Sequence, residues 1–150
     1  TGVPPKSLCF EITESVAIRS LANAAALVDA LGDLGCQFAL DDFGSGFASF
    51  SYLKTLPVDY LKIDGSFVRH LTENEVDHAM VDIINQLGHV MGLKTIAEFV
   101  ENESILKSLR RLDVDYAQGY HIGEPISLEA VCFGEKGRSL ADTRIASLAH

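Results

Sequence analysis

The feature that most constrains the fold is an alternation of short apolar runs and helical segments, repeated five times along the chain. Each apolar run has the length of a strand and ends in a loop or in polar residues. Strands that alternate with helices lie parallel and are joined by crossover helices, which predicts an α/β protein. The five predicted strands span residues 8–12, 37–41, 60–64, 94–98 and 116–118.

The predicted helices are marked by apolar residues at helical spacing. The clearest stripe runs from Val76 to Met91 and stops before Gly92, where a glycine at a helix C-terminus is typical. Residues 134–150 show no clear periodicity and are predicted to be a C-terminal tail. Other helical segments are predicted over residues 21–34, 50–56 and 105–112, and from Leu128 onward.

All five predicted strands end in groups that bind metal or transfer protons. In a parallel barrel, the inward positions at the carboxyl ends of the strands surround one site, where such barrels carry their chemistry. We therefore predict a TIM-type (β/α)8 barrel. An open doubly wound sheet also gathers ligands at strand ends and remains the alternative. The strand-end groups are Glu11, Asp41, Lys62 with Asp64, Glu98 and Gln118.

Two adjacent carboxylates, Asp41 and Asp42, follow the second predicted strand and precede a loop with two glycines, Gly44 and Gly46. Neighbouring carboxylates repel each other, and a divalent cation held by oxygen ligands is the usual compensation. Asp-Asp and Gly-Ser-Gly also occur in ordinary turns. Lys62 either neutralises these acids or handles the proton of a water, although a lysine at a barrel end can also simply extend to solvent.

Composition limits the partners of this chain. With 150 residues, of which 47% are hydrophobic and 22% charged, it forms at most one globular domain. A net charge of −9 argues against a nucleic-acid polymer as partner, so an anionic ligand has to be met by metal ions or by a few local cations. The sequence has no membrane-length apolar run and no close cysteine spacing, which predicts a cytoplasmic protein with reduced thiols. Cys9 and Cys36 are predicted to lie in the core.

Five motifs together resemble, in order and spacing, those of the EAL family of cyclic di-GMP phosphodiesterases. The resemblance runs from about Leu8 to Pro125. It implies a modified eight-stranded barrel that hydrolyses cyclic di-GMP to linear pGpG with two Mg²⁺ or Mn²⁺ ions. The motifs are Glu11-Ile-Thr-Glu14, Asp41-Asp42-Phe-Gly-Ser-Gly46, Leu61-Lys62-Ile-Asp64-Gly, Thr95-Ile-Ala-Glu98-Phe-Val-Glu101 and Gln118-Gly-Tyr120.

The resemblance also implies a role for each residue of these motifs. Direct metal ligands would be Glu11, Asp41 and Glu98, with Asp42 as a ligand of the second ion. Lys62 would contact the nucleophilic water, supported by Asp64, Glu101 and Gln118. Glu14 would anchor the loop after the two aspartates, and the implied substrate-binding residues of that loop are Phe43, Gly44, Ser45 and Gly46.

Some features depart from the family pattern. Ser45, Phe47 and Phe99 stand where the family more often has Thr, Tyr and Gly. The Glu-Ala-Leu signature and a later Asn ligand are absent from this chain. A whole barrel needs about 250 residues, so five strand-helix units leave about three strands missing. We therefore expect residues 1–133 to be the C-terminal portion of an EAL domain, followed by the tail at residues 134–150.

Several expectations about the intact protein follow from this interpretation. The parent protein is expected to carry upstream sensor or GGDEF domains, and the exposed sheet edges predict a homo-oligomer. The chain by itself is expected to be inactive, with inward residues such as Ile96 and Tyr116 lacking facing strands. The alternative function is a noncatalytic cyclic di-GMP receptor or regulatory module, because binding survives the loss of a metal ligand better than hydrolysis does.

Overall fold

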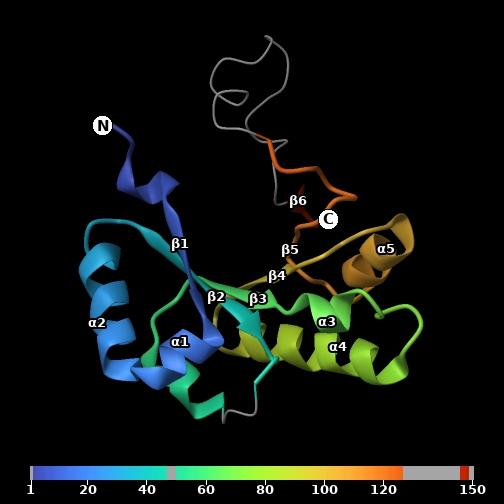
Figure 1. Cartoon of the computed structure of the whole chain (residues 1–150), viewed down its shortest axis with the longest axis horizontal. Coiled ribbons are helices and arrows are strands. Elements are labelled where there is room, and N and C mark those ends of the chain that lie inside the picture. The colour runs from blue at the N-terminus through green and yellow to red at the C-terminus, as the bar shows by residue number, and fades with distance from the viewer. Residues whose placement is uncertain (1, 47–49, 127–145, 149–150) are drawn as a thin grey trace.

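A single twisted sheet forms the centre of the computed structural model, which describes residues 2–46, 50–126 and 146–148 (Figure 1). Five strands run parallel and lie side by side in the order in which they occur in the sequence, and a sixth pairs antiparallel with the last of them. This confirms the predicted α/β class. The strands are β1 (Cys9–Thr13), β2 (Gln37–Phe43), β3 (Tyr60–Ile63), β4 (Lys94–Ala97), β5 (Tyr116–Ala117) and β6 (Ala146–Ser147).

The order of the strands favours a barrel over an open doubly wound sheet. A doubly wound sheet reverses its strand order at a switch point and carries helices on both faces. Here each of the five parallel strands pairs with its neighbour in sequence. The main crossover helices lie on the same side of the sheet (Figure 1). A barrel has the same arrangement, with its helices outside and its strands closing on one another.

Two of the crossover helices begin at asparagine caps. The side chain of Asn74 accepts hydrogen bonds from the first turn of α4 (Glu75–Val90), and Asn102 accepts one from Ile105 at the start of α5 (Glu103–Arg111). The predicted segment 50–56 is a 3-10 helix, η2 (Phe50–Thr55). The remaining elements are η1 (Pro5–Ser7), α1 (Glu14–Arg19), α2 (Leu21–Gly32) and α3 (Gly65–Val68).

Part of the prediction for the C-terminal region cannot be compared with the structure. The helix expected from Leu128 and the boundary between residues 133 and 134 lie outside the described residues. Within the expected tail, Ala146 and Ser147 form β6 against β5, and the Leu148 N–H donates to the Asp115 carbonyl at 2.7 Å. Short strands of this kind carry too few residues for a periodic pattern to be visible in the sequence. None of the described helices has the length and apolar character of a membrane span.

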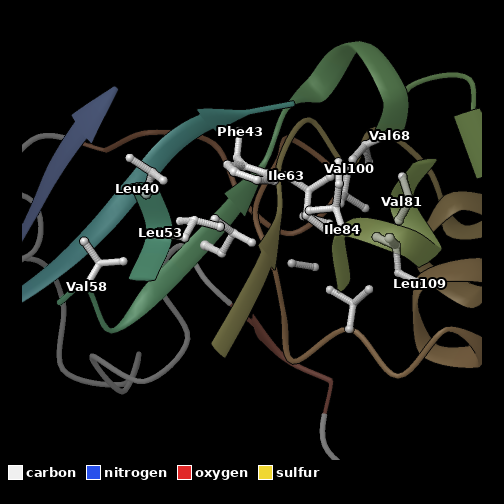
Figure 2. Close-up of a cluster of buried hydrophobic side chains, with 14 of the residues drawn as sticks. Leu40, Phe43, Leu53, Val58, Ile63, Val68, Val81, Ile84, Val100 and Leu109 are labelled. Atoms are coloured by element: carbon white, nitrogen blue, oxygen red, sulfur yellow. The ribbon is translucent and has the colours of Figure 1, made fainter. Parts of the chain in front are cut away.

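The core lies between the sheet and the helices that cover its outer face. Figure 2 shows Phe43 and Ile63 of the strands on the side of Ile84 of α4, whereas Leu40 lies near Leu53 of η2. The three strand residues have no exposed surface. Burying side chains of this size contributes about 1.5–3 kcal/mol each, so this layer fixes how the strands sit on the elements that cover them.

Two predictions about burial were wrong. Cys9 is exposed and Cys36 only partly buried, rather than both lying in the core. Cys9 belongs to β1, the first strand of the sheet, whose only strand partner among the described residues is β2. Phe10, also on β1, remains 40% exposed although its ring stacks on Phe38 at 5.5 Å. An edge strand of this kind has less cover than the apolar pattern of its sequence suggests.

The inward face near β4 is better covered than expected. Ile96, which was predicted to lack facing strands in this chain, is nevertheless only 2% exposed. In the register of the sheet it lies between Lys62 of β3 and Tyr116 of β5. The rings of Tyr60 and Tyr116 also meet edge to face, with centroids 6.0 Å apart. Long neighbouring side chains on the same face therefore cover Ile96.

At the amino-terminal end of the sheet, Asp115 ties β4 and β5 to α4. Its carboxylate accepts hydrogen bonds from Lys94 Nζ at 2.6 Å and from the Thr95 N–H at 2.9 Å, and it lies 2.9 Å from His89 Nε2. Burial raises the pKa of Asp115, but Lys94, the Thr95 N–H and His89 together outweigh it and hold that pKa below its ordinary value of 3.8. The ionised form of Asp115 therefore stabilises the fold.

We expect Asp115→Asn to lower the free energy of unfolding by about 2 kcal/mol at pH 7. Because the pKa of Asp115 is lower in the folded state than in the unfolded state, its contribution is present above the unfolded value and lost as pH falls through the folded value. The difference between the wild type and the variant should therefore shrink in acid. Urea unfolding at pH 7 and at about pH 3.5 checks this, with Asp82→Asn, at a partly exposed aspartate, as control. An equal difference at both pH values would contradict it.

Candidate active site

Three acidic side chains from different parts of the sheet converge on Lys62, which β3 places on the inward face. Lys62 Nζ lies 2.7 Å from Asp41 Oδ1, 2.9 Å from Glu98 Oε1 and 3.0 Å from Glu11 Oε2. The lysine side chain is only 2% exposed. The structure thus brings together four of the predicted site residues at the carboxyl ends of β1 to β4.

The charges at this cluster shift the pKa of its members. Burial would lower the pKa of Lys62, but its close contacts with the carboxylates of Asp41, Glu98 and Glu11 outweigh burial and raise it, so Lys62 is an ammonium at neutral pH. Burial is also the main cause that raises the pKa of Glu98 to about 6, with Asp41 and Asp42 acting in the same direction against Lys62. One lysine therefore does not neutralise the acids around it.

A bulge in β2 directs two consecutive aspartates toward one point. Successive side chains of a regular strand point to opposite faces, which would separate Asp41 from Asp42. The register between β2 and β3 shifts between Leu40 and Phe43, and Asp42 has a φ of 56°, in the left-handed region that Asp tolerates better than most residues. As a result, Asp41, Asp42 and Glu98 each offer an oxygen within 4.8 Å of the others.

This oxygen cluster fits a divalent cation. Burial and the neighbouring Asp41 and Asp64 raise the pKa of Asp42, which shows that the acids repel one another. Asp41 Oδ1 is buried and, although close to Lys62 Nζ, has no hydrogen bond of good geometry to any described residue. Carboxylate oxygens are the ligands that Mg²⁺ and Mn²⁺ prefer. Glu11, also predicted as a ligand, is not part of this three-residue group and contacts Lys62 instead.

Glu14 lies beneath the loop that follows the two aspartates. It is 2% exposed, and its two oxygens accept hydrogen bonds from the Gly44 N–H at 3.2 Å and from the Tyr52 hydroxyl at 2.7 Å. Gly44 has a φ of 96°, and a Cβ there would come within 2.9 Å of Ile84, so a glycine is needed. Glu14 therefore contacts the loop that it is predicted to anchor, and the anchoring role itself stays a prediction.

The Tyr52 hydroxyl had no signal in the sequence, because Tyr52 lies in an apolar run that predicts only core packing. Burial, together with the bond to Glu14, raises the pKa of Tyr52. Tyr52→Phe removes a hydrogen-bond donor of the buried Glu14 carboxylate and should lower the free energy of unfolding by about 1–3 kcal/mol. Chemical unfolding measures the change, and Tyr120→Phe, at a residue 73% exposed, is the matched control. Equal stability of the two variants would show that the bond contributes nothing.

The other predicted site residues are placed differently. Asp64 uses Oδ1 to accept the Ser66 N–H at 2.7 Å, which caps α3. Glu101 is half exposed and pairs with Arg69, whose Nε lies 3.5 Å from Glu101 Oε1. Gln118 Oε1 is buried without a hydrogen-bond partner among the described residues. It is thus an acceptor available to a ligand.

The loop residues predicted to bind substrate also differ from one another. The Phe43 side chain is fully buried in the core, so it does not reach a ligand. Gly44 is partly buried, whereas Ser45 and Gly46 are exposed. The Ser45 hydroxyl donates to the Asp42 carbonyl at 2.8 Å, which closes the turn next to the acidic cluster. The exposed part of this loop therefore lies within reach of a ligand at the cluster.

A cavity of about 330 Å³ adjoins the acidic cluster, and Glu98 belongs to both. Arg69 and Phe99, which line it, were not predicted as site residues. An isolated arginine after a short helix has no signal in sequence, and Phe99 stood out only as a departure from the family pattern. The lining residues are Arg69, Glu98, Phe99, Glu101, Gln118, Gly119 and Tyr120.

A sheet of sequential parallel strands that gathers acids around a lysine at its carboxyl end is typical of a TIM-type barrel with its site at the strand ends. Comparison with known proteins then identifies the family. The sequence profile of the EAL domain matches residues 1–125, so the chain belongs to the EAL domain family.

Named relatives and solved structures agree with this assignment. The chain is 50% identical over 130 residues to the cyclic di-GMP phosphodiesterase PdeB of Shewanella oneidensis, and 45% identical over 118 residues to PdeF of Escherichia coli K12, also named a cyclic di-GMP phosphodiesterase. These matches cover 87% and 79% of this chain but only 15% and 16% of the relatives.

A solved structure described as the PaMucR phosphodiesterase in complex with c-di-GMP matches with a TM-score of 0.81 and 37% identity. The match covers 86% of this chain and 52% of the solved chain. The predicted TIM-type barrel is therefore confirmed as the fold, of which this chain supplies a part.

Proposed function

We propose that the full-length protein containing this chain is a cytoplasmic, metal-dependent phosphodiesterase that hydrolyses cyclic di-GMP to linear pGpG. The observation that carries the proposal is the convergence of Glu11, Asp41 and Glu98 on Lys62, next to Asp42. The two relatives named above are cyclic di-GMP phosphodiesterases, and the PaMucR structure is a c-di-GMP complex. These names support the substrate.

The side chains of the cluster suit the hydrolysis of an anionic phosphodiester. Asp41, Asp42 and Glu98 are the residues of this chain that would hold Mg²⁺ or Mn²⁺, with Glu11 beside them. Bound ions of this class neutralise phosphate oxygens and lower the pKa of water, so that hydroxide is available at neutral pH. Without them, the acidic cluster would repel the substrate.

Lys62 acts as a hydrogen-bond donor rather than as a base. Because its pKa is raised, it is protonated at neutral pH and can hold a water or a phosphate oxygen between the carboxylates. The adjoining cavity offers further groups to the nucleotide. Gln118 Oε1 can accept a hydrogen bond, and Arg69 supplies a positive charge opposite Glu101.

Release of pGpG by the purified full-length protein tests the proposal. With Mg²⁺ or Mn²⁺ we expect conversion of cyclic di-GMP to pGpG, and with excess EDTA we expect none. The second candidate function is a noncatalytic cyclic di-GMP receptor, which is worth testing because the matched part of this chain covers only 52% of the solved phosphodiesterase. Binding of cyclic di-GMP without release of pGpG in the presence of either metal would favour the receptor.

We also propose that further domains and a homo-oligomeric state belong to the intact protein. The chain spans 15% of the Shewanella relative, which leaves most of such a protein for other parts, including sensor or GGDEF domains. The 150 residues by themselves are expected to be inactive. Sedimentation of the purified fragment, together with the pGpG assay, tests both expectations, and a stable, active monomer would contradict them.

A further inference from the structure

Phe99, the residue directly after Glu98, has an unusual backbone conformation. Its φ is 53°, in the left-handed region that bulky residues rarely adopt. Its side chain is 47% exposed, so core packing does not account for it. A backbone of this kind persists only where surrounding contacts hold it, and such residues gather at functional sites. The contacts of the Phe99 ring therefore need an explanation.

The ring of Phe99 lies along one turn of helix formed by α3 and its C-cap. Gly65 begins this turn and Arg69 ends it, with the Arg69 N–H donating to the Gly65 carbonyl at 3.0 Å. Residues four apart lie on the same side of a helix. A Cβ at Gly65 would collide with Cδ2 of the ring and lie 2.7 Å from its Cγ. The Arg69 guanidinium lies over the ring, 4.1 Å from its centroid. We call these three residues, Gly65, Arg69 and Phe99, the Phe99 stack.

The stack joins two of the chain segments that leave the acidic cluster, those that follow β3 and β4. Gly65 follows Lys62 by three residues, and Phe99 follows Glu98 by one. Lys62 Nζ and Glu98 Oε1 are 2.9 Å apart, so the stack holds together the segments that carry this ion pair. On its far side Arg69 pairs with Glu101, and all three of Arg69, Phe99 and Glu101 line the cavity beside the cluster.

We propose that Phe99 is a positioning residue, whose ring, packed on Gly65 and under Arg69, fixes Glu98 relative to Lys62 and shapes the adjoining cavity. The catalytic part of this inference rests on the proposed function. The structural part is independent of the proposed function, because it concerns contacts within the protein alone. A glycine at position 99 would adopt the same φ without strain but would provide no ring, so Phe99→Gly separates the ring from the backbone conformation.

The structural part is tested by the thermal unfolding of Gly65→Ala, Phe99→Gly and the double variant of the full-length protein. With Phe99 present, Gly65→Ala forces the ring away from α3 and should lower the melting temperature. In the Phe99→Gly background the same methyl group meets no ring, so the decrease should largely disappear. Gly32→Ala, where an added Cβ meets nothing within 4 Å, should give equal small changes in both backgrounds. An equal decrease in melting temperature caused by Gly65→Ala in both backgrounds would contradict the packing of the Phe99 ring on Gly65.

The positioning role is tested by titrating the full-length protein with Mn²⁺ alone and by steady-state kinetics. We expect Phe99→Gly to weaken Mn²⁺ binding and to lower kcat, each by about tenfold, with a smaller change in KM, as is typical for residues that orient metal ligands. Phe99→Tyr keeps the ring and should retain both properties. Arg69→Lys keeps the positive charge but loses the planar contact with the ring. Its Mn²⁺ affinity and kcat should lie between those of Phe99→Gly and Phe99→Tyr.

The possible results separate this inference from the proposed function. Unchanged Mn²⁺ binding and unchanged kcat in Phe99→Gly would overturn the positioning role. If the wild type released no pGpG, the proposed function would fail, whereas the Mn²⁺ titration and the unfolding cycle would still decide whether Phe99 positions Glu98.

Discussion

Replacing Lys62 with methionine is expected to lower kcat for cyclic di-GMP by about a thousandfold and to destabilise the metal-free protein. The methionine fills the space of the lysine stem but removes the ammonium that lies within 3.0 Å of Glu11, Asp41 and Glu98. Loss of a single donor at a reacting oxygen costs about 10²–10³ in kcat, and loss of the positive charge among three acids adds to this decrease. Removing one partner of a buried ion pair also costs about 3–5 kcal/mol of stability.

The two effects of Lys62→Met separate in the presence of metal. A divalent cation restores positive charge among the carboxylates, so Mn²⁺ should recover part of the lost stability. It should not recover kcat, because the donor itself is missing. Thermal unfolding with EDTA and with Mn²⁺ measures the stability of the variant, and the rate of pGpG release measures its kcat. Lys107→Met, at an exposed lysine on α5, is the control and should change neither. A variant with wild-type kcat would rule out the role assigned to Lys62.

Asp41→Asn is expected to weaken Mn²⁺ binding by about a hundredfold and to lower kcat by a similar or larger factor. The change keeps the size of the side chain but removes the charge of an oxygen that is buried beside Asp42 and Glu98. It also places a neutral amide next to the Lys62 ammonium. Because the Asp41 charge helps to raise the pKa of Glu98, the pKa of Glu98 should fall in this variant.

Mn²⁺ titration and kinetics of the full-length protein measure these changes. Asp82→Asn is the matched control, because Asp82 is a partly exposed aspartate on α4, away from the acidic cluster, that accepts a hydrogen bond from Gln86 of the same helix. An asparagine can accept that hydrogen bond as well, so the control should behave as the wild type. An Asp41→Asn variant with unchanged Mn²⁺ affinity would remove Asp41 from the metal site, and unchanged kcat would remove it from the active site.

The part of the site that could be predicted from sequence is the part that follows from strand geometry. Side chains alternate along a strand, and parallel strands end at the same edge, so the pattern of residues alone predicts that Glu11, Asp41, Lys62 and Glu98 lie together. Each lies at or next to the end of an apolar run, and the structure brings all four within one cluster.

The features that were missed depend on contacts between segments far apart in the sequence. The bulge that turns Asp42 toward Asp41 is a property of the pairing between β2 and β3. The burial of Cys9 was wrongly predicted because an apolar pattern does not reveal how much of an edge strand is covered. The contact of Phe99 with Arg69 joins the C-cap of α3 to the segment after β4, which lie thirty residues apart in the sequence. None of these has a periodic signal.

The sequential order of the sheet has a consequence for how the acidic cluster forms during synthesis. Each parallel pairing joins strands separated by a single crossover, so every loop to be closed is short and each closure costs little entropy. Because synthesis runs from the N-terminus, β1 and β2 emerge with Glu11 and Asp41, β3 follows with Lys62, and β4 comes after it. Pulsed hydrogen exchange on the emerging chain would show whether the strands dock in this order. If they do, the ammonium is in place before Glu98 arrives, and the last acid joins a cluster that already contains its counter-ion.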